Sequence, residues 1–228
     1  MKINYFGHSS FLIEAVGKRI VVDPFLTGNP LCPVLAASVE CDTIVLTHGH
    51  ADHTGDALEL AQRNKAPIIA VYELANHYQA LGVETVAMGV GGSAEFDFGR
   101  LIFTPALHSS SFVDGNGVAH YAGNPAGVVL QSEGTTLYHA GDTALFSDMK
   151  LIAERTPIDV ALLPIGDYFT MGIDDAVRAV DFLKPKCVVP VHYNTFPPIE
   201  TDPLVFKKKV EALGVDCVVL EPGQSMEA

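Results

Sequence analysis

Four potential metal ligands lie within six residues of this chain, in the segment His48-Gly49-His50-Ala51-Asp52-His53. Neutral imidazole and carboxylate groups suit Zn²⁺, Mn²⁺ or Fe²⁺. His48 and His50 are two residues apart, so in an extended segment they project to the same side and could hold one ion together. Asp52 and His53 follow the bend toward the next element and could hold a second ion. A polar turn with solvated histidines is the alternative, but a turn has no need of three histidines at this spacing.

The predicted elements on either side place this segment at the end of a strand. Residues 43–47 are an apolar, β-branched run typical of a buried strand, and residues 54–65 have the apolar spacing of a helix. Open α/β sheets bind their ligands in loops beyond the carboxyl ends of strands. The four potential ligands are therefore expected in such a loop.

The segment resembles the signature of the metallo-β-lactamase superfamily, and polar residues farther along follow the order of that superfamily's landmarks. The resemblance implies two metal sites, with the ligands His48, His50 and His108 for the first ion, Asp52, His53 and His192 for the second, and Asp142 bridging both. It also implies that the early Asp23 buttresses the metal loop. The alternative interpretations without metal binding are turn residues for Asp23 and Asp142, a surface histidine for His108 and a core histidine for His192.

A narrower resemblance comes from residues 7–11 and the pair Met171-Gly172, which look like a subgroup of small metal-dependent hydrolases similar to ascorbate-6-phosphate lactonases. The implied reaction is hydrolysis of a small ester, lactone or phosphodiester by a hydroxide that bridges two divalent ions. Zinc or manganese is the expected metal, with iron or nickel as alternatives, and Asp52 and Asp142 are the implied catalytic carboxylates. Two other hypotheses for the function stay open: a mononuclear iron-dependent dioxygenase of the same fold, and a metal-binding protein without turnover.

Six further residues are weaker candidates for supporting the metal ligands or contacting the substrate, namely Asp23, His8, His139, Tyr193, Ser109 and Asn194. Ordinary loop or strand polarity is the alternative for each of them. A polar cleft of this kind favours an oxygen-rich, anionic small molecule as the substrate.

Composition limits the partners. The chain of 228 residues has a net charge of −13 and a pI near 4.9, which disfavours nucleic acid because a phosphate backbone selects basic surfaces. Its four cysteines have no metal-site spacing, which favours a reducing cytoplasm. No signal-peptide pattern and no membrane-spanning apolar run are found. A homo-oligomer is left open.

The order of predicted elements indicates the fold. Two similar halves, about 1–115 and 116–228, each begin with strands and continue with alternating strands and helices, the last strand being expected at 215–220. The Gly- and Asn-rich segment 109–127 is expected to be a loop that joins the halves and borders the cleft. Packed sheet to sheet with outer helices, the halves predict one α/β domain, a four-layer αββα sandwich of two mixed β-sheets, which is the fold that the resemblance also implies.

Overall fold

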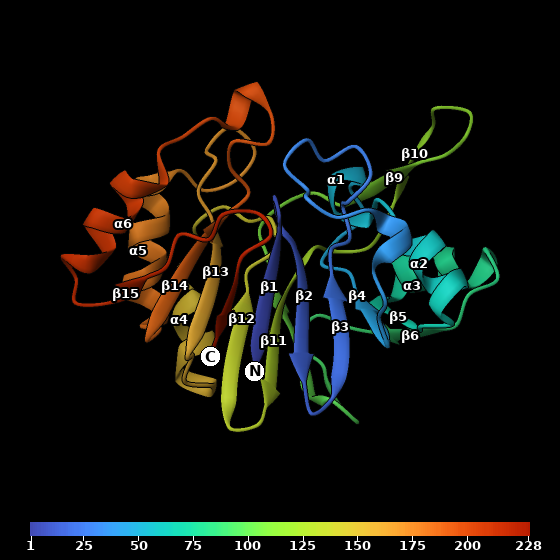
Figure 1. Ribbon diagram of the computed structural model, residues 1–228, viewed down its shortest axis with the longest axis horizontal. Helices are drawn as coiled ribbons and strands as arrows, with labels where there is room; N and C mark the ends of the chain where they lie inside the picture. The colour runs from blue at the N-terminus through green and yellow to red at the C-terminus, as the bar shows by residue number, and fades with distance from the viewer.

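Two large mixed β-sheets face each other in the computed structural model, which describes residues 1–228 (Figure 1). The first sheet has the strand order β16 (Ser225–Glu227), β1 (Lys2–Gly7), β2 (Ser10–Ala15), β3 (Lys18–Val22), β4 (Thr43–Val45), β5 (Ile68–Val71), β6 (Thr85–Met88). The second has the order β15 (Asp216–Cys217), β14 (Cys187–Val191), β13 (Val160–Pro164), β12 (Thr135–His139), β11 (Ala126–Ser132), β8 (Gly99–Pro105), β7 (Ser93–Phe96). In the first sheet, neighbouring strands are antiparallel in the run β1-β2-β3 and parallel in the run β3-β4-β5-β6. In the second sheet, they are antiparallel in the run β7-β8-β11-β12 and parallel in the run β12-β13-β14-β15.

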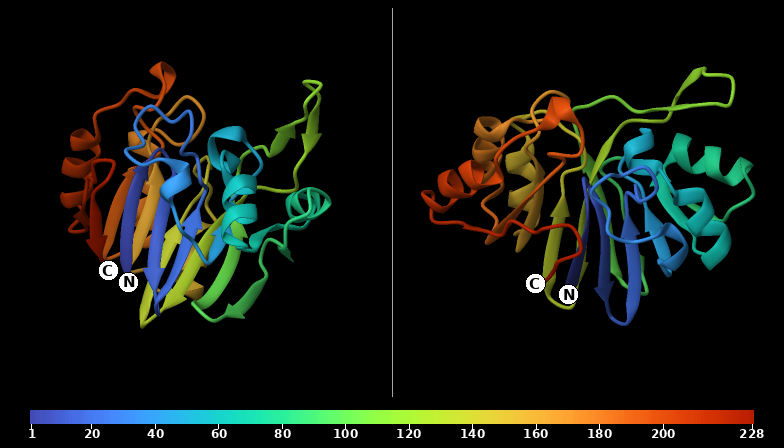
Figure 2. Two further views of the ribbon diagram at one scale, coloured as in Figure 1. Left: turned by 45° about the vertical axis from the view of Figure 1, so that its right-hand side comes forward. Right: turned by 45° about the horizontal axis from the view of Figure 1, so that its top comes forward.

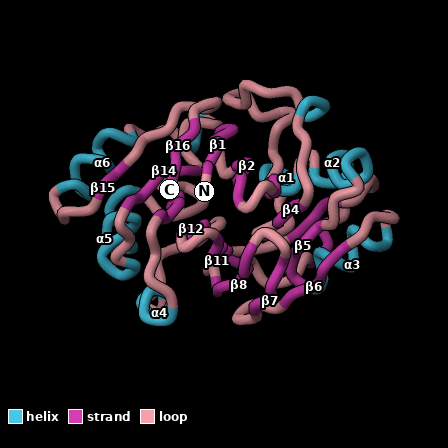
Figure 3. Tube along the Cα trace, turned by 60° about the horizontal axis from the view of Figure 1, so that its bottom comes forward, coloured by secondary structure: helices cyan, strands magenta, loops and turns pink.

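Helices lie on the two outer sides of this pair of sheets, as Figure 3 shows. The helices α1 (Ala51–Thr54), α2 (Ala57–Asn64) and α3 (Tyr72–Ala80) flank the first sheet, and α4 (Met149–Arg155), α5 (Ile173–Leu183) and α6 (Pro203–Glu211) flank the second. Short 3-10 turns span Ala36–Ser38 and Pro197–Ile199. The predicted four-layer αββα sandwich is therefore confirmed. None of the helices combines the length and hydrophobicity that crossing a bilayer requires.

Alternation along the strands of the second sheet divides the hydrophobic core into two parts. Along β8, Leu101 and Phe103 join the core between the sheets, whereas Ile102 packs with the helices on the outer face. Along β11, Val128 and Val129 divide in the same way. Because successive side chains of a strand point to opposite faces, a sheet that is apolar at every position must be covered on both sides. The helices α4 and α5 supply the second cover.

The sheets divide the chain at a different point from the expected boundary near residue 115. The strands β7 and β8 lie before that residue but pair in the second sheet, and the C-terminal strand β16 returns to pair with β1 in the first. The glycine-rich residues 89–92 connect the two sheets. The segment expected to be a loop contains a two-stranded hairpin of β9 (Ser111–Val113) and β10 (Ala119–Tyr121), which projects from the body of the molecule (Figure 2).

Local boundaries also differ from the sequence predictions. The single helix expected at 54–65 is two helices, α1 and α2, broken at Gly55 and Asp56. The Asp56 carboxylate accepts hydrogen bonds from the backbone N–H groups of Leu26 (2.9 Å) and Thr27 (2.8 Å), which ties this break to a loop distant in sequence. The strand expected at 215–220 is limited to β15, and the chain ends with β16.

The topology brings four loops to one edge of the molecule. The loops that follow β4, β8, β12 and β14 carry, in that order, the His48–His53 segment, His108, Asp142 and His192. The short helix α1, which contains Asp52 and His53, lies at the upper edge in Figure 1. The strands β4, β12 and β14 end at this edge through parallel pairing. The strand β8 ends there too, because β8 and β12 both pair antiparallel with β11 and so run in the same direction. Strand-end placement of this kind is expected for α/β sheets.

The core between the sheets gives a stability test. Phe103 is 0% exposed, so Phe103→Ala should lower the free energy of unfolding by about 3–5 kcal/mol through lost burial and a new cavity. Phe169→Ala is the matched control, because Phe169 is 51% exposed and should change that free energy by less than about 0.5 kcal/mol. Urea unfolding followed by circular dichroism measures both. Equal effects of the two substitutions would contradict this core.

Candidate metal centre

Three histidines form one group of ligand atoms at the sheet edge. Ring nitrogens of His48, His50 and His108 lie within 4.8 Å of one another. His48 Nε2 and His50 Nδ1 are 2.9 Å apart, and the His108 ring centroid lies 5.3 Å and 5.1 Å from those of His48 and His50. These are the three residues expected for a first metal site, and the structure brings them together.

A second group lies beside the first. Ligand atoms of Asp52, His53 and His192 lie within 4.8 Å of one another, together with a nitrogen of His8. His53 and His192 are completely buried or nearly so, at 0% and 1% exposure, whereas the Asp52 side chain is 31% exposed. The three residues expected for a second metal site are therefore together, with His8 as an additional neighbour.

The Asp142 carboxylate lies between the two groups. Its oxygens are 3.9 Å from His48 Nε2 and 3.6 Å from His108 Nε2 on the side of the first group. They are 3.2 Å from His53 Nε2 and 3.1 Å from His192 Nε2 on the side of the second. One carboxylate thus contacts imidazoles of both groups.

Asp23 holds the segment that contains the ligands. Its Oδ1 accepts a hydrogen bond from the Thr47 backbone N–H (2.8 Å), and its Oδ2 accepts from the Thr47 hydroxyl (2.6 Å) and from His53 Nδ1 (2.7 Å). Asp23 is 0% exposed, so these bonds are shielded from water. The carboxylate fixes both the backbone before His48 and the orientation of the His53 ring.

This network also determines which ring nitrogens face the centre. The Thr47 hydroxyl donates its proton to Asp23, so its oxygen accepts from His48 Nδ1 at 3.0 Å, which leaves a lone pair on His48 Nε2. His53 donates Nδ1–H to Asp23, so a neutral His53 also presents a lone pair at Nε2. His53 Nε2, both His192 ring nitrogens and Asp142 Oδ1 are buried without a hydrogen-bond partner. Buried ligand atoms that converge without hydrogen-bond partners fit a cation between them.

Burial and charge set the protonation of the first group. Burial lowers the pKa of His50 and of His108 below the ordinary imidazole value, and it lowers that of His48 well below. These rings are therefore neutral at pH 7, the form that binds a metal ion.

Around the two carboxylates of the centre, neighbouring charges and hydrogen bonds outweigh burial in setting the pKa values. Burial alone would raise the pKa of Asp142, but the charges of His192 and His53 hold it well below its usual range. Burial alone would lower the pKa of His53, but Asp142 and Asp23 raise it well above its usual value. For Asp52, burial is outweighed by the hydrogen bond with His8 and the charge of His53, so its pKa is also lowered. Both carboxylates are ionised at neutral pH.

Two glycines allow the loops to approach each other. A Cβ on Gly49 would lie 2.5 Å from Ala122 Cβ, and a Cβ on Gly141 would lie 2.8 Å from the Ala126 carbonyl oxygen. Three non-glycine residues at the centre have left-handed backbone angles, with φ of 59° at His8, 48° at Asp23 and 54° at His192. Such conformations cost free energy and cluster at functional sites.

Of the weaker candidates other than Asp23, His8 and Ser109 lie at the centre. His8 is 0% exposed, with Nε2 3.2 Å from Asp52 Oδ2 and Nδ1 2.9 Å from the Thr195 hydroxyl oxygen. Ser109 lies at the exposed edge, with Oγ 3.5 Å from His50 Nε2.

The other weak candidates have different surroundings. His139 donates from Nε2 to the Ser9 carbonyl (3.0 Å) and accepts at Nδ1 from the Gly141 N–H (3.0 Å), so neither nitrogen is free to move protons. Tyr193 packs in the outer core of the second sheet, where burial raises its pKa to about 12. Asn194 caps its own loop by accepting from the Thr201 N–H at 2.7 Å.

Sequence reasoning assigned no positioning role to four hydroxyl residues near the candidate ligands. Thr47 and Thr195 contact His48 and His8 as described above. Ser110 Oγ accepts from the Gly49 N–H (3.1 Å), and Thr143 Oγ1 accepts from the Leu107 N–H (2.9 Å). Their only signal in the sequence is adjacency to a candidate ligand or its neighbour, which does not reveal a hydrogen bond across the fold.

Comparison with known proteins shows which family and fold this chain is similar to. The model of the beta-lactamase superfamily domain matches residues 18–193. A UPF0173 metal-dependent hydrolase of Geobacillus thermodenitrificans is 54% identical over 227 residues, which cover 100% of both chains. The solved structure of Igni18, a novel metallo hydrolase from the archaeon Ignicoccus hospitalis, is 40% identical with a TM-score of 0.90, over 100% of this chain and 98% of that one. An isothiocyanate hydrolase from Delia radicum gut bacteria, 20% identical with a TM-score of 0.78 over 100% of this chain and 99% of that one, is similar in fold.

The chain therefore belongs to the metallo-β-lactamase superfamily and, within it, to the family of metal-dependent hydrolases that these full-length relatives represent. The narrower likeness to ascorbate-6-phosphate lactonases stays a prediction.

The role of Asp23 can be tested through metal affinity. Asp23→Ala removes the acceptor that fixes the His53 ring, so the affinity for Zn²⁺ should fall about 10–100-fold. Asp97→Ala is the control, because Asp97 is an exposed carboxylate that pairs with Lys18. Competition with a chromogenic chelator measures affinity, and circular dichroism verifies that each variant is folded. A folded Asp23→Ala variant with the affinity of Asp97→Ala would refute this positioning role.

Proposed function

We propose that this chain hydrolyses a small ester, lactone or phosphodiester with the help of two divalent metal ions. His48, His50 and His108 would hold the first ion, and Asp52, His53 and His192 the second, with Asp142 as the shared ligand. The observation that carries the proposal is the position of Asp142, whose carboxylate lies within 3.9 Å of imidazoles of both groups. The inner core of 40 residues contains side chains of both sheets, which supports a single domain around this centre.

The chemistry of the donors supports zinc or manganese. The two groups offer imidazole nitrogens and carboxylate oxygens only, and none of the four cysteines belongs to either. Such a set suits borderline divalent ions rather than thiolate-selected ones. When bound, the ions lower the pKa of a coordinated water toward neutrality and polarise the oxygen of the bond to be cleaved.

Asp52 is the carboxylate available to the reacting water. It is ionised at neutral pH and its side chain is 31% exposed, so it can accept a hydrogen bond from the attacking water and hold that water in line with the substrate. Asp142 is 3% exposed and is limited to holding the two groups together.

His8 positions Asp52. Burial and the nearby His192 lower the pKa of His8 to about 4, so its ring is neutral at pH 7. A neutral ring beside an ionised carboxylate carries its proton on Nε2 and donates it to Asp52, while Nδ1 accepts from the Thr195 hydroxyl. The ring is thus a donor to Asp52 in this proposal and is not counted as a metal ligand.

A substrate screen tests the proposal. The protein loaded with Zn²⁺ or Mn²⁺ is offered nitrophenyl esters, lactones and a nitrophenyl phosphodiester, with and without a chelator. We expect hydrolysis of at least one class that the chelator abolishes and added metal restores. Oxygen consumption measured on the iron-loaded protein distinguishes a dioxygenase, and that activity without hydrolysis would contradict the proposal.

Single substitutions should remove one ion each. His108→Ala takes a ligand from the first group and His192→Ala takes one from the second, so each variant should retain about one equivalent of metal where the native protein holds two. His120→Ala is the control, since His120 is exposed on the β10 strand and pairs with Asp114. Elemental analysis after gel filtration measures the metal. Unchanged content in both variants would contradict the assignment.

Binding of the two ions should differ in its pH dependence. His50 and His108 are neutral at pH 7 because burial lowers the pKa of each, so the first ion displaces no proton from them. His53 is protonated because Asp142 and Asp23 outweigh burial and raise its pKa well above 6.5, so the second ion must displace that proton. The affinity for the second ion should therefore fall about tenfold for each pH unit below neutrality.

Calorimetry in two buffers with different ionisation enthalpies counts the released protons. Asp23→Asn removes one of the two charges that raise the pKa of His53, so this variant should release less than the native protein. Equal proton release on binding the first and the second ion would contradict the assignment of His53.

A further inference from the structure

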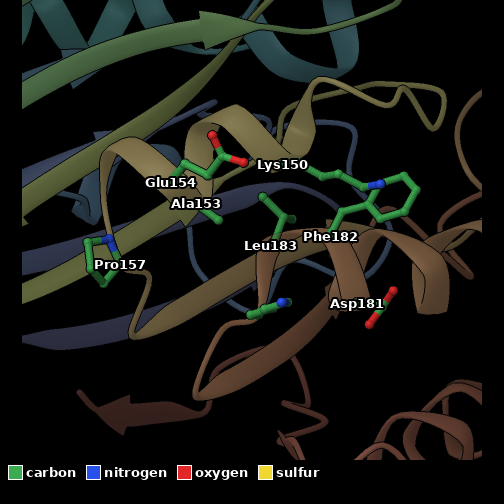
Figure 4. Close-up of a pocket in the computed structure, with 8 residues that line it drawn as sticks. Lys150, Ala153, Glu154, Pro157, Asp181, Phe182 and Leu183 are labelled. Atoms are coloured by element: carbon green, nitrogen blue, oxygen red, sulfur yellow. The ribbon is translucent and has the colours of Figure 1, made fainter.

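A groove of about 530 Å³ opens directly beside the metal centre. His50, a member of the first ligand group, also lines this groove. One wall consists of the helices α1 to α3, and the other of the β9 strand and the turn after it. The volume lies in the range of small-molecule sites. A second groove, of about 480 Å³ between α4 and α5, contains none of the candidate ligands, and Lys150 Nζ lies 4.5 Å from the Phe182 ring centroid there (Figure 4).

Apolar side chains dominate both walls of the groove beside His50. The helix side contributes Leu58, Tyr78 and Leu81, and the hairpin side contributes Phe112 and Val113. Leu81 is 43% exposed and Val113 is 66% exposed. Apolar side chains left open to water next to a reactive centre favour an apolar ligand group, because covering them releases that surface from water.

The hairpin wall is held in place by specific contacts. The Phe112 ring stacks on His77 of α3 with ring centroids 3.7 Å apart. The Phe112 ring also stacks with His120, and these two ring centroids are 5.2 Å apart. At the base, Ser110 Oγ accepts from the Gly49 N–H at 3.1 Å, which ties the hairpin to the ligand segment. The wall is therefore part of the same framework as His50.

Charge argues against an anionic group in this groove. None of the 14 lysine and arginine side chains lines it. Its one carboxylate, Asp114, already accepts from the N–H groups of Asn116 (2.9 Å) and Val118 (3.0 Å) and contacts His120 Nε2 at 2.9 Å. A phosphate placed there would lose water without gaining a cation, at a large cost in free energy.

We propose that this groove binds an uncharged apolar acyl, alkyl or aryl group of the substrate, adjacent to the bond that is cleaved. The substrate class is then an ester or lactone with an apolar substituent, rather than the anionic molecule that the polar residues of the sequence favour. This inference rests on the proposed function, because it takes the centre beside His50 to be the reacting one.

The test uses hydroxamic acids, whose two oxygens bind a metal ion while the carbon chain varies. Acetohydroxamate, butanohydroxamate and octanohydroxamate are titrated into the zinc-loaded protein by calorimetry. If each methylene buries half of its surface, affinity should rise about twofold per methylene, or about 60-fold from acetyl to octanoyl. An eight-carbon hydroxamate that ends in a carboxylate should bind at least about tenfold more weakly than octanohydroxamate, since its charge finds no partner.

A matched pair of variants locates the effect. Leu81→Glu places a charge in the groove. The ratio of octanohydroxamate to acetohydroxamate affinity should then fall to less than about a third of the native ratio. Leu204→Glu makes the same change at an exposed leucine on α6 and should keep the native dependence.

The possible results separate this inference from the proposed function. Acetohydroxamate binding with no gain from chain length, or equal behaviour of Leu81→Glu and Leu204→Glu, would overturn the apolar groove and leave the metal centre standing. Failure of every hydroxamate to bind the zinc-loaded protein would overturn both.

Discussion

Convergence of ligand atoms in a space shielded from water is the costly feature around which this molecule is organised. The Nε2 atoms of His48, His53 and His192 each lie within 3.9 Å of an Asp142 carboxylate oxygen. Several of these atoms have no hydrogen-bond partner. In the deprotonated form that binds metal, these ligand atoms repel one another in a low dielectric, and a cation between them reverses the sign of that interaction. The rest of the fold can be understood as the framework that holds this arrangement before a metal binds.

That framework works because two sheets contribute strand ends to one edge. The first sheet supplies the segment after β4, and the second supplies His108, Asp142 and His192 from three separate strands. Two of these loops are held by interactions that do not depend on metal. Asp23 fixes the β4 loop, and glycine at position 141 lets the β12 loop pass against Thr47. Positioning groups of this kind affect metal affinity without binding the ion.

The sequence was sufficient for features that follow from local pattern. The αββα layers follow from the order of predicted strands and helices, and the ligand groups follow from the family resemblance of the His48–His53 motif and the later polar landmarks. The sequence was insufficient where contacts between residues distant in the chain determine the local structure. The break at Gly55 depends on Asp56 reaching Leu26, the pairing of β16 depends on the edge of β1, and the central place of His8 depends on Asp52 and Thr195. His139 illustrates the converse, because a strand-end histidine near Asp142 is held by backbone groups of its surroundings.

We propose that this centre holds a pair of metal ions that share Asp142. Anomalous diffraction from crystals of the metal-loaded protein, collected on both sides of the absorption edge of the bound metal, tests it most directly. We expect two anomalous peaks about 3.5–4 Å apart. One peak should lie among His48, His50 and His108 and the other among Asp52, His53 and His192, with the Asp142 carboxylate in contact with both. A single peak at full occupancy, or peaks outside these groups, would contradict it.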